Sequence, residues 1–366
     1  MLHHFRPVAS VPVLLAMSYF GLGAPEAVAG CWDFPIASTG IQSAVVVVDR
    51  GRTAVGLPEI GRAFVVSAGL SESIELRPPP GDAFADGSGF GTSMAVDGDI
   101  VAVGAVRIGG HRAGVEQPAG VFHIGAVYTF DVSNGAFLWH SMSDSERVFG
   151  HSVSVDEYDV AFGVYEAPGL DGGSVRLRGA AHGAIALRSR GGAPLRVVNG
   201  PSDARGFGAK LSGRAPLITT SASADTLGIW ALQDGIAILL ASMPATLNGI
   251  PATDVAAKGS TTAVSAGGGF SSDAGRTLVM VPGSTPYEIT AGGPLAISED
   301  RLSVLIHAAP EGQQHNTLIV YDISIYGAPV EVAKLDHVIG AAIEGRTAFV
   351  VLAEPGAAVR LCEMGT

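Results

Sequence analysis

Short runs in which apolar and small residues alternate with polar ones recur along the chain, each broken by a tight polar turn. The clearest run, residues 90–105, reads FGTSMAVDGDIVAVGA, and a close copy starts 59 residues later at Phe149. A weaker copy starts at Phe207, after another 58 residues. A period of two places successive side chains on opposite faces of a strand, so each copy predicts a β-hairpin with turn residues such as Asp97 and Gly98.

The hairpin pattern continues in a degraded form over the rest of the chain. Further hairpins are expected in residues 43–55, 254–265, 295–306 and 339–352, which makes seven in all. A third apolar strand follows each of the seven, and a fourth follows six of them. The seventh copy ends near its third strand, and residues 32–36, at the opposite end of the chain, are available as its missing fourth strand.

This organisation predicts an all-β fold, a seven-bladed β-propeller of four-stranded antiparallel blades whose ring is closed by the N-terminal strand. About 48 residues per blade agrees with the length of known propeller repeats. A β-sandwich would have no reason to contain seven copies. An open solenoid would not leave its last copy one strand short while its first has a strand to spare. We therefore expect residues 30–366 to form a single propeller domain.

The composition agrees with many short buried strands and argues against one class of partner. Of the 366 residues, 47% are hydrophobic and only 15% are charged, and 50 glycines with 21 prolines suit tight turns. The net charge is −12. Because binding to a phosphate backbone requires a basic surface, we expect no nucleic acid partner.

The first 29 residues have the pattern of a signal peptide. Arg6 precedes an apolar run over residues 11–24, and residues 27–29 supply an A-x-A cleavage site. The run is short for a membrane span, and no second run follows, so the mature chain is expected to have no transmembrane segment. The protein should therefore be exported, to the periplasm, the cell surface or the exterior. A less favoured alternative is a lipobox at residues 28–31 that would lipidate Cys31, but Pro25 and Glu26 separate it from the apolar run.

The repeated residues resemble a known family. The Phe-Gly pair, the Val-Ala-Val-Gly-Ala ending of the second strand and the Gly-Ala-Val-Tyr-Thr-Phe of the third are similar to FG-GAP repeats, found in integrin α-subunit propellers and in many exported bacterial proteins. The likeness is strong over residues 90–163 and fair to about residue 220. Calcium-binding members carry a D-x-D-x-D-G-x-x-D loop between the first two strands. Turns 97–99 and 156–159 are too short to surround calcium, so the resemblance implies the fold without its calcium sites.

A search for catalytic and metal-binding patterns gives none. The histidines beyond the targeting segment are single, and neither H-E-x-x-H nor H-x-H occurs, so no metal site or cofactor is predicted. The sequence around Ser152 lacks the second glycine of a serine elbow, and the glycines of residues 87–91 precede no helix that could bind phosphate. No catalytic residue is therefore assigned. Trp32, Trp139 and Trp230 are expected to fill space between blades.

Candidate ligand-binding residues lie in the loops of one face of the ring. In a four-stranded meander the b–c and d–a connections (between second and third strands, and between successive blades) emerge on the same face. The b–c loops of the second and third blades are long, and long loops on a rigid scaffold are where binding concentrates. Three acidic residues also precede Phe-Gly pairs, although they could instead hold the d–a turns by local hydrogen bonds. The candidates are Asp86, Arg107, His111, Arg112, Asp144, Glu166 and Asp203.

These patterns favour a non-catalytic binding or scaffolding propeller that contacts a protein or glycan through the long-loop face of blades 2–4. The alternative is a propeller enzyme, a hydrolase or lyase acting on extracellular polymers, because propeller active sites collect residues from several blades. A convergence of buried carboxylates or histidines at the mouth of the central channel would distinguish the two.

The chain contains two cysteines, at opposite ends of the expected domain. Cys31 starts the borrowed fourth strand and Cys362 ends the last third strand. In the other blades a short turn joins these two points, so closing the ring should bring the two sulfurs together where a covalent link is missing. Export makes oxidation plausible, and we predict a Cys31–Cys362 disulfide.

Overall fold

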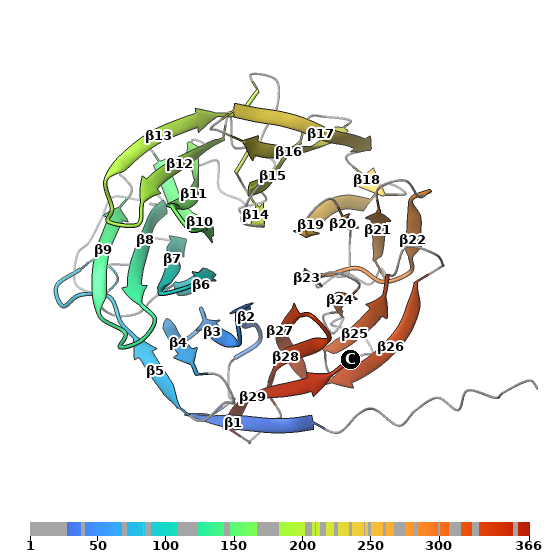
Figure 1. Ribbon diagram of the computed structural model, residues 1–366, viewed down its shortest axis with the longest axis horizontal. Helices are drawn as coiled ribbons and strands as arrows, with labels where there is room; N and C mark the ends of the chain where they lie inside the picture. Colours follow the sequence, from blue (N-terminus) through green and yellow to red (C-terminus); the bar gives the residue numbers. More distant parts are fainter. Residues whose placement is uncertain are drawn as a thin grey trace, which may run out of the picture.

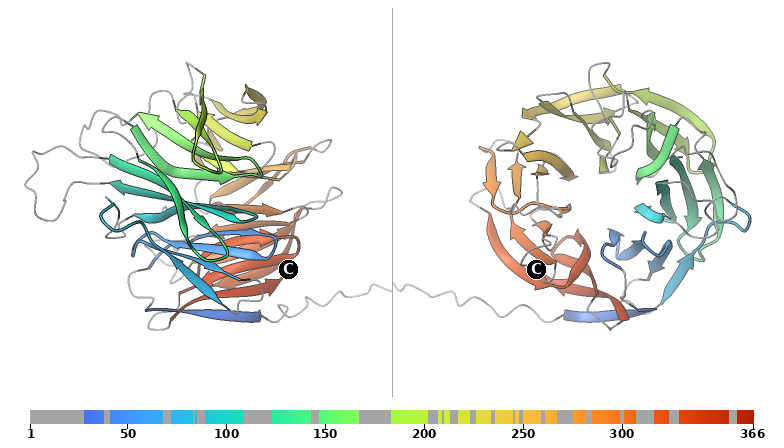
Figure 2. Two further views of the ribbon diagram at one scale, coloured as in Figure 1. Left: turned by 60° about the vertical axis from the view of Figure 1, so that its left-hand side comes forward. Right: turned by 180° about the vertical axis from the view of Figure 1, so that it is seen from behind.

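The structure is a computed structural model, and every regular element in the part of the chain that it describes is a β-strand. It describes residues 28–37, 41–67, 72–82, 84, 89–108, 123–142, 147–166, 183–201, 207–208, 210–212, 217–222, 226–233, 236–244, 246–247, 250–258, 261–266, 275–281, 285–298, 301–306, 316–323, 329–353 and 358–366. Within these residues, 29 strands form antiparallel sheets arranged around a central opening as in a propeller (Figure 1). Figure 2 shows the same ring from the side and from behind.

The sheets follow one another along the chain and are numbered here in that order. Sheet 1 contains β2 (Val45–Asp49), β3 (Arg52–Leu57), β4 (Arg62–Val66) and β5 (Ser73–Leu76). Sheet 2 contains β6 (Phe90–Asp97), β7 (Ile100–Ile108), β8 (His123–Asp131) and β9 (Phe137–Met142). Sheet 3 contains β10 (Arg147–Val155), β11 (Asp159–Glu166), β12 (Ala184–Ser189) and β13 (Pro194–Asn199).

The second half of the chain continues this order. Sheet 4 contains β14 (Leu211–Ser212), β15 (Leu217–Ala222), β16 (Thr226–Gln233) and β17 (Ile236–Pro244). Sheet 5 contains β18 (Thr246–Leu247), β19 (Ile250–Lys258), β20 (Thr261–Ala266), β21 (Arg276–Met280) and β22 (Tyr287–Ile289). Sheet 6 contains β23 (Leu295–Ser298), β24 (Arg301–Ile306), β25 (Thr317–Asp322) and β26 (Val330–Asp336). Sheet 7 contains β27 (Val338–Glu344), β28 (Thr347–Leu352), β29 (Ala358–Gly365) and β1 (Val28–Ala37).

The prediction of uniform four-stranded repeats is wrong at one sheet. Six of the described sheets have four strands, but sheet 5 has five because β18 pairs with β19. In that hairpin Leu247 faces Ile250, which leaves two residues between the strands, and the sequence there is Asn248-Gly249. Asn-Gly is the strongest two-residue hairpin signal, so local turn chemistry adds a strand that the repeat pattern did not predict.

The two ends of the chain meet in sheet 7. β1 pairs antiparallel with β29 and occupies the outermost position, as the missing fourth strand should. Cys31 lies directly opposite Cys362 in this pairing, and the two sulfurs form a disulfide. Cys31 is exposed at the edge, whereas Cys362 is fully buried. The predicted disulfide is confirmed, and so is the prediction that the N-terminal strand completes the last sheet.

Buried apolar side chains hold neighbouring sheets together. Seven core clusters are present among the described residues, and each joins two consecutive sheets, including sheets 7 and 1 across the chain ends. The cluster between sheets 1 and 2 is rich in aromatic rings, with Phe90, Tyr128 and Phe130 in mutual contact and almost fully buried. The predicted space-filling role of the tryptophans is confirmed, because Trp32, Trp139 and Trp230 each pack against such a cluster.

The residues of the repeat motif lie where two sheets come closest. Gly150, the glycine of a Phe-Gly pair, has a φ of 83° that glycine tolerates. Its carbonyl accepts a buried hydrogen bond of 2.7 Å from the Ser93 hydroxyl of the preceding sheet. Ser152 makes the equivalent bond, 2.6 Å, to the carbonyl of Gly208 in the following sheet. The motif therefore encodes packing between sheets, which explains why it recurs.

The ends of the innermost strands are bridged by side chains that bond to the backbone of the next sheet. The Ser298 hydroxyl accepts the amide of Gly345 at 2.9 Å, and the Glu344 carboxylate accepts the amides of Arg50 and Gly51 at 2.6 and 2.9 Å. Asp49 continues the series by accepting an amide of sheet 2 at 3.1 Å. These bonds cross three successive junctions, including the one between the two chain ends, and reinforce the ring at its centre.

Four outermost strands contain a β-bulge, at Leu138, Leu195, Leu240 and Val332. Each bulged residue is 41–53% exposed. A bulge twists an edge strand away from any partner that would extend the sheet. These bulges allow apolar residues at the rim without continuous edge pairing between molecules.

No helix among the described residues is long and apolar enough to cross a membrane.

Candidate functional site

Most of the predicted ligand-binding residues lie outside the described residues. This applies to Asp86, His111, Arg112, Asp144 and Asp203. Two others are placed by their backbone alone: Arg107 is the penultimate residue of β7, and Glu166 is the last residue of β11. Both are near the b–c ends of second strands in neighbouring sheets. We call this side of the ring the connection side, and the side of the a–b and c–d turns the turn side.

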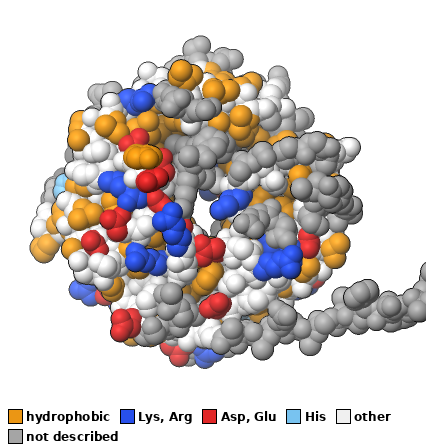
Figure 3. All heavy atoms as spheres, in the orientation of Figure 1, with side chains coloured by type: hydrophobic (Ala, Val, Ile, Leu, Met, Phe, Trp, Pro, Cys, Tyr) orange, Lys and Arg blue, Asp and Glu red, His pale blue; other side chains and the backbone are white. Residues whose placement is uncertain are grey.

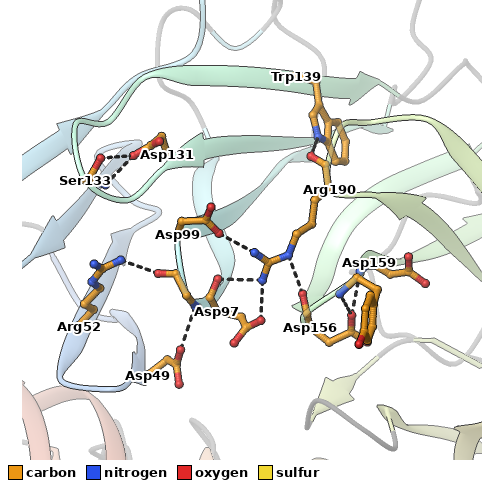
Figure 4. A network of polar contacts seen from close by, with 12 residues as sticks. Asp49, Arg52, Asp97, Asp99, Asp131, Ser133, Trp139, Asp156, Asp159 and Arg190 are labelled. Atoms are coloured by element: carbon orange, nitrogen blue, oxygen red, sulfur yellow. Dashed lines mark hydrogen bonds and ion pairs between the residues drawn. The ribbon is translucent and has the colours of Figure 1, made fainter.

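On the turn side, acidic residues of sheets 2 and 3 surround one guanidinium group (Figure 4). Arg190, in the c–d turn of sheet 3, donates to the carboxylates of Asp97 and Asp99 in the a–b turn of sheet 2, at 2.6 and 2.5 Å. It also donates to the backbone carbonyls of Asp97 and Asp156, at 3.1 and 3.0 Å. The Asp97 side chain is only 4% exposed. A charge buried to that degree needs compensation, which the guanidinium supplies.

Two contacts extend this network to both sides. Arg52 of sheet 1 donates to the carbonyl of Gly98 at 2.6 Å, and Trp139 donates its indole N–H to the carbonyl of Arg190 at 2.7 Å. Gly192 has a φ of 87°, and a Cβ there would lie 2.7 Å from the Trp139 ring. The c–d turn of sheet 3 is therefore shaped to receive this tryptophan, and the network fastens sheets 1, 2 and 3 together.

The pKa values of two carboxylates at the margin of the network are shifted in opposite directions. The hydroxyl and amide of Ser133 bond to Asp131 and lower the pKa of that carboxyl. Partial burial, with the neighbouring charge of Asp156, raises the pKa of Asp159. Figure 3 shows acidic and basic side chains gathered beside the central opening. The charged groups that make hydrogen bonds in Figure 4 bond to one another, to Ser133 or to backbone groups. The main role of the network is therefore structural.

The network bears on the expected independence from calcium. The carboxylates of Asp97 and Asp99, which resemble the start of a calcium loop, both bind Arg190. We expect the thermal unfolding midpoint to be the same in millimolar calcium and in chelator. An ion at 100 times its dissociation constant would add about 2.7 kcal/mol to the stability of the folded state, so even moderate calcium binding would raise the midpoint visibly and contradict this expectation.

A second cluster lies between sheets 1 and 2 and was missed by sequence reasoning. Asp82, in the connection that follows β5, has a side chain only 3% exposed. Its carboxylate accepts the hydroxyl of buried Tyr128 at 2.5 Å and the amide of Phe84 at 3.1 Å. Its other oxygen lies 3.2 Å from Nδ1 of His140, whose side chain is 38% exposed. Tyr128 and His140 face each other across β8 and β9.

The geometry fixes what His140 offers to solvent. Its Nδ1 faces the Asp82 carboxylate in an ion-pair contact, which leaves Nε2 on the opposite side of the ring. Such a nitrogen suits a ligand hydrogen bond, a proton-accepting role or metal coordination. Asp82 comes four residues before Asp86, and His140 four residues before Asp144. The cluster therefore lies in the chain beside two of the predicted candidates, and only the pairing across strands could have revealed it.

The cluster does not have the channel-mouth location expected of a propeller active site. β9 is the outermost strand of sheet 2, so His140 lies toward the rim. Among the described residues, no group of three or more histidine, cysteine, aspartate or glutamate side chains is arranged to hold a metal ion. Neither cluster in the described part of the chain therefore provides a complete catalytic constellation.

Comparisons with known proteins agree with the fold. The sequence matches no family model and no curated protein. A chain of a mitotic checkpoint complex is 14% identical, with 100% of this chain and 98% of that chain covered and a TM-score of 0.55. The hydrazine synthase of Kuenenia stuttgartiensis is 10% identical over 91% and 98% of the two chains, with a TM-score of 0.52. The acylaminoacyl peptidase of Pyrococcus horikoshii is 10% identical over 79% and 44%, with a TM-score of 0.50. Identities this low support the propeller fold alone.

Proposed function

We propose that the protein is an exported, non-catalytic propeller that binds or scaffolds a protein or glycan through the connection side of sheets 2–4. The proposal rests on a difference between the two sides of the ring, one of which has its charged network bonded between sheets while the other has the longest loops. On the turn side, the charged groups that the network contains are engaged in joining sheets 1–3. The connection side carries the two longest b–c loops of the sequence, and a rigid ring is a suitable base for such loops.

The wider identity of the chain is part of the same proposal. Residues 1–29 act as a signal peptide, and residues 30–366 form one propeller in which all seven sheets, the five-stranded one included, serve as blades. The disulfide supports export, because such bonds persist in oxidising compartments. The packing roles of Ser93, Gly150 and their equivalents support membership among FG-GAP-like repeat proteins, since they give the shared motif a physical reason.

A shortened loop tests the binding role. Ile108 and His123 face each other in the β7–β8 ladder, so a two-residue Asn-Gly turn in place of residues 109–122 would close a regular hairpin. The wild-type protein and this variant would be compared on a glycan array and against a displayed peptide library. We expect ligands selected by the wild type to be lost by the variant, with an unchanged thermal midpoint.

A variant of the turn side serves as the control. Tyr158 is 73% exposed in the a–b turn of sheet 3, and its replacement by serine should leave all selected ligands bound. Ligands retained by the shortened variant but lost on the Tyr158→Ser change would place the binding surface on the wrong side of the ring and refute the proposal.

A further inference from the structure

The outermost strand of sheet 4 exposes a run of large aliphatic side chains. On β17, Ile236, Ile238, Leu239 and Leu240 are 64%, 44%, 48% and 53% exposed. The strand lies along the outer rim of the ring (Figure 1). Single exposed apolar residues are ordinary, but a contiguous group of this kind is typical of a contact surface.

The outermost strands of the other six sheets carry residues that discourage contact with a further strand. Exposed sheet edges are commonly protected by charged side chains, because an incoming apolar strand would remove water from the charge. Five of these strands contain a charged residue and the sixth a histidine: Asp33 on β1, Glu75 on β5, His140 on β9, Arg196 on β13, Glu288 on β22 and Lys334 on β26. The nine residues of β17, IAILLASMP, include neither a charged residue nor a histidine.

The neighbouring sheet leaves the isoleucines of β17 uncovered. Ile238 lies opposite Ala231, which packs in the cluster between sheets 4 and 5. Residues two apart on a strand share a face, so Ile236 projects to the same side as Ile238. The outermost strand of sheet 5, β22, has three residues against the nine of β17. β17 therefore extends past the strand that would otherwise pack against it, which explains the exposure of both isoleucines.

We infer that β17 is a homodimer contact, in which it lies antiparallel against β17 of a second copy of the chain. A two-fold axis brings the same surface of both copies together, so each copy offers the other an uncharged apolar strand. The net charge of −12 makes two copies repel each other, and this repulsion is smallest where they meet through a strand without charge.

The geometry of sheet 4 limits this contact to two copies. The bulge at Leu240 restricts backbone pairing to Ile236–Leu239, so side chains supply most of the contact. The other edge strand of the sheet, β14, lies beside the central opening, so the pairing does not propagate from sheet to sheet (Figure 1). A lipid surface fits β17 less well. Membrane-surface contacts are usually rich in Trp, Lys and Arg, which β17 lacks, and the acidic chain repels anionic headgroups.

Sedimentation velocity of the full oxidised chain over a dilution series tests the contact. We expect the wild type to shift from dimer to monomer on dilution. Ile236→Lys and Ile238→Lys should each raise the dissociation constant at least about tenfold, because two like charges then lie in one apolar contact. The thermal midpoint of each variant is measured alongside, and Ile236 is the more exposed of the two positions. Residues 1–29 are common to all variants, so only the difference between variants counts.

A charge exchange separates pairing of β17 with itself from contact with another surface. Ile238 lies beside the two-fold axis of the proposed pair, so its two copies come close. Ile238→Lys and Ile238→Glu should each be monomeric alone, and their equimolar mixture should form a heterodimer, because opposite charges then face each other. Native mass spectrometry distinguishes the heterodimer from either homodimer. A mixture that stays monomeric would overturn the inference.

A matched control is available on another outermost strand. Val330 on β26 is 60% exposed, and Val330→Lys should leave the dimer unchanged. A wild type that is monomeric at every concentration would overturn the inference, as would dimers that survive both lysine changes on β17. Flotation with phosphatidylcholine vesicles detects a lipid occupant, and wild-type binding that Ile236→Lys abolishes would also overturn it. The shortened-loop variant retains β17 and should dimerise, so the dimer and the proposed ligand-binding role succeed or fail separately.

Discussion

Removing the disulfide by the double change Cys31→Ala and Cys362→Val is expected to lower the free energy of unfolding by about 3–5 kcal/mol. The crosslink joins residues 331 positions apart, so nearly the whole chain lies in the loop that it closes. In the loop-entropy model a crosslink of this span strongly restricts the unfolded chain. Valine is chosen at position 362 because that side chain is fully buried in the cluster between sheets 6 and 7.

Denaturant unfolding at equilibrium measures the effect, and two comparisons separate the crosslink from packing. The single variant Cys31→Ala breaks the same bond at an exposed position and should lose nearly as much stability as the double variant. Reduction should destabilise the wild type and leave the double variant unaffected. A double variant within about 1 kcal/mol of the oxidised wild type would show that the β1–β29 ladder and the apolar cluster between sheets 7 and 1 close the ring without covalent help.

Sequence alone predicted the parts of the fold that repeat. The alternation in residues 90–105 became the β6–β7 hairpin, and the surplus strand at one end completed the sheet that was short at the other. These inferences succeed because strand period and turn chemistry act locally. They also succeed because a closed ring of four-stranded sheets leaves no sheet one strand short. The five-stranded sheet was missed because the β18–β19 pairing, with Asn-Gly between the two strands in the sequence, lies outside the repeat.

Sequence could not predict the polar clusters, because they join residues that are far apart in the chain. Arg190 meets Asp97 across 93 positions, and Tyr128 meets Asp82 across 46. Neither pair has a spacing that a motif search recognises. The long b–c loops were selected by length alone, and five of the seven ligand-binding candidates lie outside the described residues, so those assignments stay predictions.

A large single-residue effect is expected at Gly104, in the middle of β7. A Cβ at this position would lie 2.0 Å from the carbonyl oxygen of Gly150 and 2.2 Å from the hydroxyl of Ser93. The carbonyl belongs to backbone with a φ of 83° and already accepts the Ser93 hydrogen bond, so it has little freedom to move. We expect Gly104→Ala to cost about 3 kcal/mol, at the upper end of what overpacking usually costs.

Four further variants decide whether the close approach of sheets 2 and 3 is the cause. Gly30→Ala introduces a Cβ with no atom within 4 Å and should change stability by less than about 0.5 kcal/mol. Gly345→Ala also meets no atom, but its φ of 57° should cost about 1 kcal/mol through backbone strain alone. Combining Gly104→Ala with Ser93→Ala removes the hydroxyl clash but keeps the carbonyl clash, so most of the loss should remain. If the double variant instead recovered the stability of Ser93→Ala, the serine side chain and not the distance between the two backbones would set the requirement for glycine.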